Sequence, residues 1–265
     1  MNTKMSPNKD YIVIDIGGSG TRVGVVTPHG IAGVRRENVN SVDELSAVIT
    51  TRSRNIGGVA LSIAGFVHSE SGSVGLSRCA PWLEGNLRDM LAAKLPPGIP
   101  IHIVNDGEAH ALALKNQPNL QLGAFNLSIG TSPGLGALDT SGNPYRAIDG
   151  GNWDIGDMLV KTSAPRPNAW WCLGEEGLEE LINTHGKEKG LRRFGYRLGH
   201  FMTQLAIILR PRTVGLSGGI ITRYWPHFKE GVNAEFNPSN MPTPDIIVQK
   251  DDEAALCGLI TLFND

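Results

Sequence analysis

The chain contains little of what marks secreted, metal-rich or membrane proteins. Among its 265 residues are three cysteines, Cys79, Cys172 and Cys257, which are far apart in the sequence. They match no metal-ligand spacing and no disulfide framework, so we expect a reducing compartment. No apolar run approaches the roughly 20 residues that a membrane span needs, and residues 1–10 lack the apolar core of a signal peptide. We therefore expect a cytoplasmic protein that contacts no membrane.

The familiar signatures of nucleic-acid and nucleotide binding are also absent. Only 19% of the residues are charged, the net charge is −2, and no long basic run occurs, so we expect no nucleic-acid partner. The sequence has no Gly-x-x-x-x-Gly-Lys-Ser/Thr run, which excludes a phosphate loop of that type. A dinucleotide fingerprint needs a helix directly after its glycines, whereas the β-branched residues of 23–26 favour a strand.

A glycine turn between two apolar segments is the most informative feature of the N-terminal part. Residues 11–16 and 23–26 are typical of strands, and Asp15 lies near the end of the first. Between them lies the turn, which consists of Gly17, Gly18, Ser19, Gly20 and Thr21. Glycines permit positive φ and let backbone N–H groups converge on an anion. The turn is thus a candidate phosphate-binding hairpin, with Asp15 as a carboxylate for a metal-bound water. An ordinary β-hairpin that needs glycines for its geometry explains the same residues equally well.

Strands and helices alternate along the chain, which predicts an α/β fold with parallel strand pairing. Ser41 and Glu44 have the spacing of a capping box, which predicts a helix toward Thr51. Residues 252–263 are predicted to form a closing helix, and residues 117–119 are a candidate domain boundary. A long helix is predicted from apolar residues at alternating spacings of three and four, namely Leu191, Phe194, Leu198, Phe201, Leu205 and Ile208.

Three further strand ends carry polar or glycine residues that suit phosphoryl transfer. Asn105 and Asp106 follow one predicted strand, and Gly130-Thr131 and Gly218-Gly219 follow two others. Phosphoryl transfer needs backbone amides and a metal to spread charge, and a carboxylate to orient the acceptor hydroxyl and take its proton. Asp106 is our candidate for that base. Helix capping by Asn-Asp-Gly explains the same residue types equally well.

Taken in order, these segments resemble the ROK family (repressor, open reading frame, kinase) of bacterial sugar kinases, in the actin-like ATPase superfamily. The resemblance rests on residues 15–21, Asn105-Asp106, residues 130–136 and residues 216–219, and it spans nearly the whole chain. It implies an α/β, two-lobed actin-like ATPase (ribonuclease H-like) fold with the active-site cleft between the lobes. Residues 1–116 plus 250–265 would form the N-terminal lobe, and residues 117–249 the C-terminal lobe.

The resemblance also implies roles for individual residues. Asp15, with Asp106, would hold Mg²⁺, and Asp106 would be the general base on a sugar hydroxyl, with Asn105 on a neighbouring hydroxyl. The nucleotide would contact both the N-terminal turn and later glycine turns, through Gly17, Gly18, Ser19, Gly20, Thr21, Gly130, Thr131, Gly218 and Gly219. Gly65 matches a glycine that lines the sugar pocket, and Trp82 matches an aromatic residue above it, where a packing role is equally open.

The chain departs from the family pattern in two places. The family's Glu-x-Gly-His, whose Glu and His reach sugar hydroxyls, corresponds here to Asp154-Ile155-Gly156-Asp157. Glu180 matches the glutamate at the sugar's anomeric end, with Glu179 as its rival. The family's zinc-binding cysteines and histidine correspond to Trp171, Leu173, Leu178 and Asp157, which cannot together bind zinc, so we expect no zinc. Apolar packing of the tryptophans and leucines would take over its role.

The expected activity is that of an ATP-dependent kinase for a hydroxyl of a hexose, aminohexose or related polyol, with ATP and Mg²⁺ as cofactors. Polyphosphate glucokinases, a short branch of the same family, keep polyphosphate open as the donor. A sensor of sugar or nucleotide without turnover is the second hypothesis. Because only ten residues precede the first predicted strand, we do not expect the DNA-binding helix-turn-helix of the family's repressors. The partner would be a small-molecule sugar, with a homodimer left open.

Overall fold

A computed structural model of the chain describes residues 5–27, 29–161, 166–238, 242–251 and 253–264. These residues form two compact units. Unit 1 comprises Met1–Asn116, Arg146–Asn152 and Glu253–Asp265, and unit 2 comprises Gln117–Tyr145 and Trp153–Asp252. Residues 146–152, which the sequence analysis assigns to the second lobe, therefore belong to unit 1. None of the helices in these described ranges is both long and apolar enough to cross a membrane.

Unit 1 is built on a five-stranded sheet with the order β3-β2-β1-β4-β8. Its strands are β1 (Asp10–Gly17), β2 (Gly20–Thr27), β3 (Gly30–Glu37), β4 (Ile56–Ile63) and β8 (Ile101–Asn105). The first three strands are antiparallel neighbours, whereas β4 and β8 pair in parallel with the strands beside them. The carboxyl ends of β1, β4 and β8 consequently meet at one edge, where Asp15, Ile63 and Asn105 lie.

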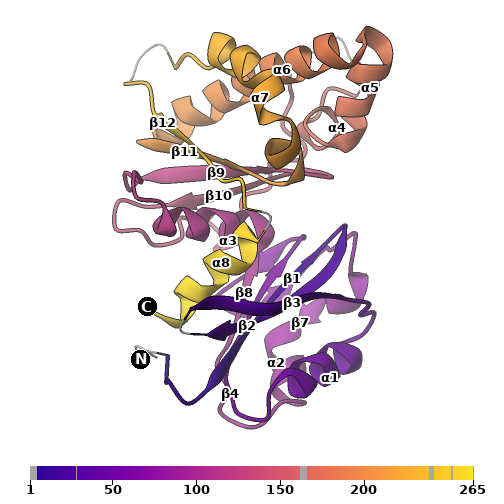
Figure 1. Ribbon diagram of the computed structural model, residues 1–265, viewed down its shortest axis with the longest axis vertical. Coiled ribbons are helices and arrows are strands. Elements are labelled where there is room, and N and C mark those ends of the chain that lie inside the picture. The colour runs from indigo at the N-terminus through magenta and orange to yellow at the C-terminus, as the bar shows by residue number, and fades with distance from the viewer. Residues whose placement is uncertain (1–4, 28, 162–165, 239–241, 252, 265) are drawn as a thin grey trace. The chain divides into compact units, whose positions relative to one another are not determined.

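Helices cover this sheet and a small three-stranded sheet adjoins it (Figure 1). The helices are α1 (Val42–Arg52), α2 (Leu87–Ala92), α3 (Asp106–Ala113) and α8 (Ala254–Ile260), and the short strands are β5 (Val67–His68), β6 (Ser73–Val74) and β7 (Gly85–Asn86). Three 3₁₀ turns span Pro81–Leu83, Leu114–Asn116 and Thr261–Phe263. Ser41 caps α1 by accepting the Glu44 amide, which confirms the predicted helix start. The predicted start of the closing helix, Asp252, lies outside the described residues.

Unit 2 is a four-stranded sheet with the order β10-β9-β11-β12. The strands are β9 (Ala124–Ile129), β10 (Pro133–Leu138), β11 (Thr213–Ser217) and β12 (Asp245–Val248), and the helices are α4 (Ala169–Cys172), α5 (Glu175–His185), α6 (Lys187–Leu209) and α7 (Gly219–Glu235). Strands β9 and β10 are antiparallel, whereas β11 pairs in parallel with both β9 and β12. In Figure 1 the helices α6 and α7 lie together on one side of this sheet.

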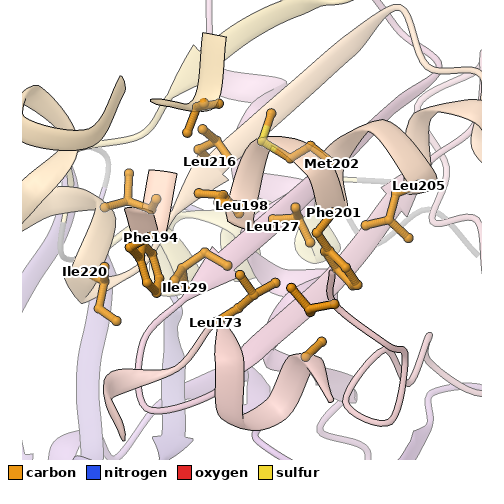
Figure 2. Close-up of a cluster of buried hydrophobic side chains, with 14 of the residues drawn as sticks. Leu127, Ile129, Leu173, Phe194, Leu198, Phe201, Met202, Leu205, Leu216 and Ile220 are labelled. Carbon is orange, nitrogen blue, oxygen red and sulfur yellow. The ribbon is translucent and has the colours of Figure 1, made fainter. Parts of the chain in front are cut away.

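The core of unit 2 joins the sheet to one side of α6. Phe194, Leu198 and Phe201 are fully buried and lie among Leu127 and Ile129 of β9 (Figure 2). Five of the six apolar residues that predict this helix are buried, but Ile208, in its last turn, is 69% exposed. The prediction is wrong for Ile208 because the face that packs on the core continues from Leu205 to Leu209, and Ile208 lies beside that face.

Candidate functional site

Asp15 lies at the carboxyl end of β1, between two polar residues on the neighbouring strands. The sheet register pairs Asp15 with Arg22 on β2 and with Ser62 on β4. Arg22 donates to Asp15 Oδ2 from Nη2 at 2.7 Å and from Nε at 3.2 Å, and the Ser62 hydroxyl donates to Oδ1. Asp15 is only 8% exposed, and its negative charge is offset by the guanidinium beside it.

The predicted strand–turn–strand at residues 11–26 is present as a hairpin with Gly18 and Ser19 as its two-residue loop. Gly17 and Gly20 face each other, and Gly20 has a φ of +108°, in the left-handed region that favours glycine. A Cβ atom added at Gly17 or Gly20 would meet no atom within 4 Å, so there is room beside the loop. Thr21, the second residue of β2, differs from the other four residues of the turn because it is only 4% exposed.

Asn105 ties the ends of two strands to the start of α3. Its side-chain amide donates to the carbonyl of Gly65 at 2.8 Å, and its Oδ1 accepts the Gly107 amide at 2.8 Å as the cap of α3. Asp106 is the first residue of that helix. The capping role that the sequence allows is therefore present, and Asn105 supplies it. This leaves the carboxylate of Asp106 for another task, although its Oδ1 also accepts the Gly107 amide at 3.0 Å.

Asp106 and His110, one helical turn apart on α3, both have strongly shifted pKa values. Desolvation, and next the negative charge of Asp15, together raise the pKa of Asp106 to about 6, against hydrogen bonds that lower it. Desolvation lowers the pKa of His110 to about 4, with Arg22 adding to the effect and Asp15 opposing it. At neutral pH Asp106 is therefore an ionised carboxylate with unusual affinity for a proton, as a general base requires.

Gly65 has a packing reason to be glycine. A Cβ atom there would lie 2.7 Å from the Leu76 carbonyl oxygen, so the backbones of these two segments can approach only without a side chain. Trp82 is partly buried against the core of unit 1, as its packing interpretation predicts. The ligand roles of both residues stay predictions.

In unit 2 the other two glycine turns lie at neighbouring strand ends. The register pairs Ser217 at the end of β11 with Ser128 on β9, and a Cβ on Gly218 would lie 2.5 Å from the Ile129 carbonyl oxygen. Gly218 has a φ of +94° and precedes α7 without a side-chain cap. An α-helix begins with amides that lack intrahelical partners, which is a favourable place for a phosphate. A Cβ on Gly130 or Gly219 would meet nothing within 4 Å, so both turns have open space beside them.

The three acidic residues predicted for the sugar are spread over unit 2. Asp154 and Asp157 are exposed, and Asp154 Oδ1 accepts the Gly156 amide at 3.0 Å. Glu180 lies on α5, where its Oε2 is 3.7 Å from Arg197 Nη2 on α6. No hydrogen bond or ion pair between the described residues joins Glu180 to Asp154 or Asp157. Their common role in sugar binding stays a prediction.

Three of the four positions that the resemblance matches to zinc ligands carry hydrophobic side chains at the core of unit 2, whereas the fourth, Asp157, is exposed. Leu173 and Leu178 are buried, with Trp171 packed against them. Apolar packing therefore occupies this region, and the absence of zinc stays a prediction. Cys172 is also buried, and its thiol donates to the carbonyl of Arg166 at 3.1 Å.

Asp15 and Asp106 are the two residues that could hold magnesium, and their role as its ligands stays a prediction. Among the described residues no group of three or more His, Cys, Asp or Glu is placed to hold a metal ion. Mg²⁺ needs fewer protein ligands, since it commonly uses one or two carboxylates together with waters and substrate phosphates. The charge of Asp15 raises the pKa of Asp106, which indicates that the two carboxyl groups interact within unit 1. A divalent cation beside them would relieve that repulsion.

Arg22, Ser62 and His110 were not singled out by the sequence analysis. Arg22 could have been found, because a two-residue loop at Gly18-Ser19 places positions 15 and 22 directly opposite each other and their charges are opposite. Ser62 pairs with Asp15 through a parallel register that no local motif specifies.

Comparisons with known proteins show which fold this is. No known family model matches the chain, and no curated protein shows significant similarity to it. Many solved structures match nearly all of it, and three of them represent the range of functions. A ROK family protein from Streptococcus pneumoniae, in complex with sucrose, has a TM-score of 0.79 at 21% identity and covers 96% of this chain and 97% of its own. A ROK family glucokinase from Streptomyces griseus, in complex with glucose and AMPPNP, has a TM-score of 0.80 at 15% identity, with 96% and 98% covered.

The third is a ROK family transcriptional regulator, a homologue of the E. coli MLC protein, with a TM-score of 0.80 at 12% identity. It covers 97% of this chain and 78% of its own. The chain thus has the α/β actin-like ATPase fold of the ROK sugar kinases. The resemblance that the sequence predicts is confirmed at the level of the fold.

Proposed function

We propose that this protein is an ATP-dependent sugar kinase of the ROK type, which phosphorylates a hydroxyl of a hexose, aminohexose or related polyol. The observation that carries the proposal is the environment of Asp106. A carboxylate at the first turn of α3, with a pKa of about 6 and with Asp15 nearby, suits proton abstraction near neutral pH. The fold shared with a glucokinase in complex with glucose and AMPPNP supports the same chemistry.

In this proposal Asp106 accepts the proton of the sugar hydroxyl as the hydroxyl oxygen attacks the γ-phosphorus of ATP. The bond between that phosphorus and the bridging oxygen breaks, and ADP leaves with the electron pair. Asn105, fixed by Gly65 and Gly107, would contact a neighbouring hydroxyl. Mg²⁺, held through Asp15 and Asp106, would neutralise phosphate charge when bound.

The nucleotide would be bound through backbone amides. In unit 1 the loop at Gly17–Gly20 has open space beside it, as the β- and γ-phosphates require. In unit 2 the turn at Gly130-Thr131 and the start of α7 at Gly218-Gly219 lie at adjoining strand ends. Thr131 also donates its hydroxyl to Glu175 at 3.3 Å, which fixes the conformation of that turn against α5.

The test is sugar-dependent ADP release, measured with a panel of hexoses, aminohexoses and polyols. Loss of a general base typically lowers turnover by about 10²- to 10⁴-fold, so we expect Asp106→Asn to lose that much kcat while nucleotide binding is retained. Asp43→Asn, at a side chain that is 80% exposed, is the matched control and should keep full turnover. Near-normal turnover in Asp106→Asn would remove Asp106 as the base. Polyphosphate in place of ATP identifies the donor in the same assay.

A second candidate is a sugar sensor without turnover. It is favoured by the engagement of Asp15 with Arg22 and Ser62, and by the exposed Asp157 at the position of a family histidine. The ROK transcriptional regulator shows that the fold also serves regulation. Heat stabilisation by a sugar, without ADP release from ATP or use of polyphosphate, would support the sensor over the kinase.

A further inference from the structure

Unit 2 has a polar hollow that lies along the facing sides of α5 and α6. Its volume is about 540 Å³, within the range of small-molecule sites, and it is also lined by Lys161 and by Glu235 at the end of α7. Asp154 and Asp157 do not line it. The hollow is therefore built from residues that the proposed kinase reaction does not use, apart from Glu180.

The spacing on α6 separates this hollow from the core. Arg193, Arg197 and His200 recur at intervals of four and three and line the hollow. Phe194, Leu198 and Phe201, one residue further along, are fully buried against the sheet (Figure 2). One side of the helix thus holds the fold together, while the other presents charged side chains that packing does not require.

Cations outnumber acids in the lining. Lys161, Arg193 and Arg197 oppose only Glu180 and Glu235. The pKa of His185, which also lines the hollow, is lowered by desolvation and then by the charges of Arg193 and Lys189. The excess of cations in the lining favours an anionic ligand.

Two buried polar atoms of residues that line the hollow make no hydrogen bond to any described residue, although Glu180 Oε2 lies 3.7 Å from Arg197 Nη2 as an ion pair. Within the described residues, neither Arg197 Nη1 nor Glu180 Oε2 has a hydrogen-bond partner, although each is almost inaccessible to solvent. Arg197 offers a planar pair of donors, which suits a phosphate or carboxylate. Glu180 offers an acceptor, which suits a hydroxyl. The Glu180 side chain is 36% exposed and that of Arg197 11%, so a small rotation of either would present its buried atom to a ligand that carries both an anionic group and hydroxyl groups.

We propose that this hollow binds a small anionic polyol, of the class that includes sugar phosphates and sugar acids. Binding there requires no turnover, so the proposal stands apart from the proposed kinase activity. The test is isothermal titration calorimetry of the full chain, without ATP, with glucose 6-phosphate and gluconate as probes. Glucose and inorganic phosphate supply the hydroxyl groups and the anion separately.

Arg193→Gln is the informative variant because Arg193 is exposed, so its replacement leaves packing intact. Arg223→Gln is the matched control, since Arg223 is an exposed arginine on α7 that does not line the hollow. We expect at least one probe to bind, tenfold or more weakly to Arg193→Gln than to the unmodified chain, and unchanged to Arg223→Gln. Equal affinity of the two variants, no binding of either probe, or inorganic phosphate binding as tightly as glucose 6-phosphate would overturn the proposal.

Discussion

The raised pKa of Asp106 predicts a specific dependence of catalysis on pH. A base must be ionised, so kcat/KM for the sugar should fall with unit slope as the pH drops below about 6. At pH 5 a base with a pKa of about 6 retains about a tenth of its plateau activity, whereas one at the ordinary value of 3.8 retains about nine-tenths. The measurement is kcat/KM between pH 4.5 and 8 at saturating ATP and magnesium.

The same assay on Asp15→Asn tests the physical cause of the shift. Removing the negative charge of Asp15 takes away one of the two causes that raise the pKa of Asp106, so the acidic limb should move to lower pH. Its plateau should also fall, because Asp15 is a proposed magnesium ligand. If the acidic limb came instead from protonation of ATP, it would lie at the same pH in the unmodified chain and in Asp15→Asn. A limb that does not move in Asp15→Asn, or a flat profile from pH 5 to 7 in the unmodified chain, would refute the reasoning.

Three further predictions concern stability. Asp106→Asn should stabilise the fold at pH 7 by up to about 3 kcal/mol, from roughly two pKa units at 1.36 kcal/mol each. A carboxyl group whose pKa is higher in the folded than in the unfolded chain destabilises the folded state as the pH rises above 3.8, and does so fully above about 6. Denaturation midpoints at pH 7 and pH 3.5 check this, since the gain should vanish at the lower pH. Gly218→Ala should cost at least about 1 kcal/mol, because its φ is positive and a Cβ would lie 2.5 Å from Ile129 O. Gly219→Ala, where the Cβ meets nothing, is its control in urea denaturation. Arg146→Met should cost about 3–5 kcal/mol by leaving Glu108, 4% exposed, without its bidentate partner, whereas Arg54→Met at an exposed position should leave the urea midpoint unchanged.

The alternating strands and helices of this chain could be predicted because their signals are local. The hairpin at residues 11–26 is marked by β-branched residues around glycines, and α6 by its apolar spacing. Strand β12 was not predicted, because its four residues, Asp245–Val248, are a short segment without regular alternation of polar and apolar side chains. It pairs with β11 through a contact distant in sequence.

The candidate site could be predicted only in part, because pairing across strands decides its chemistry. Asp15 and Asp106 follow from their places at strand ends. The Asp15–Ser62 contact depends on the register between β1 and β4, and the bidentate pair of Arg146 with Glu108 joins positions 38 residues apart. No local motif specifies such contacts. The hollow beside α6 depends in the same way on which helix packs against it.

Phosphorus-31 NMR of the protein with ATP, magnesium and each sugar of the panel tests the central claim most directly. The account predicts that a phosphate monoester resonance grows together with ADP for at least one sugar, and that Asp106→Asn forms it at least about a hundredfold more slowly. A sugar that protects the protein against heat but never acquires a phosphoryl group, from ATP or from polyphosphate, would contradict it.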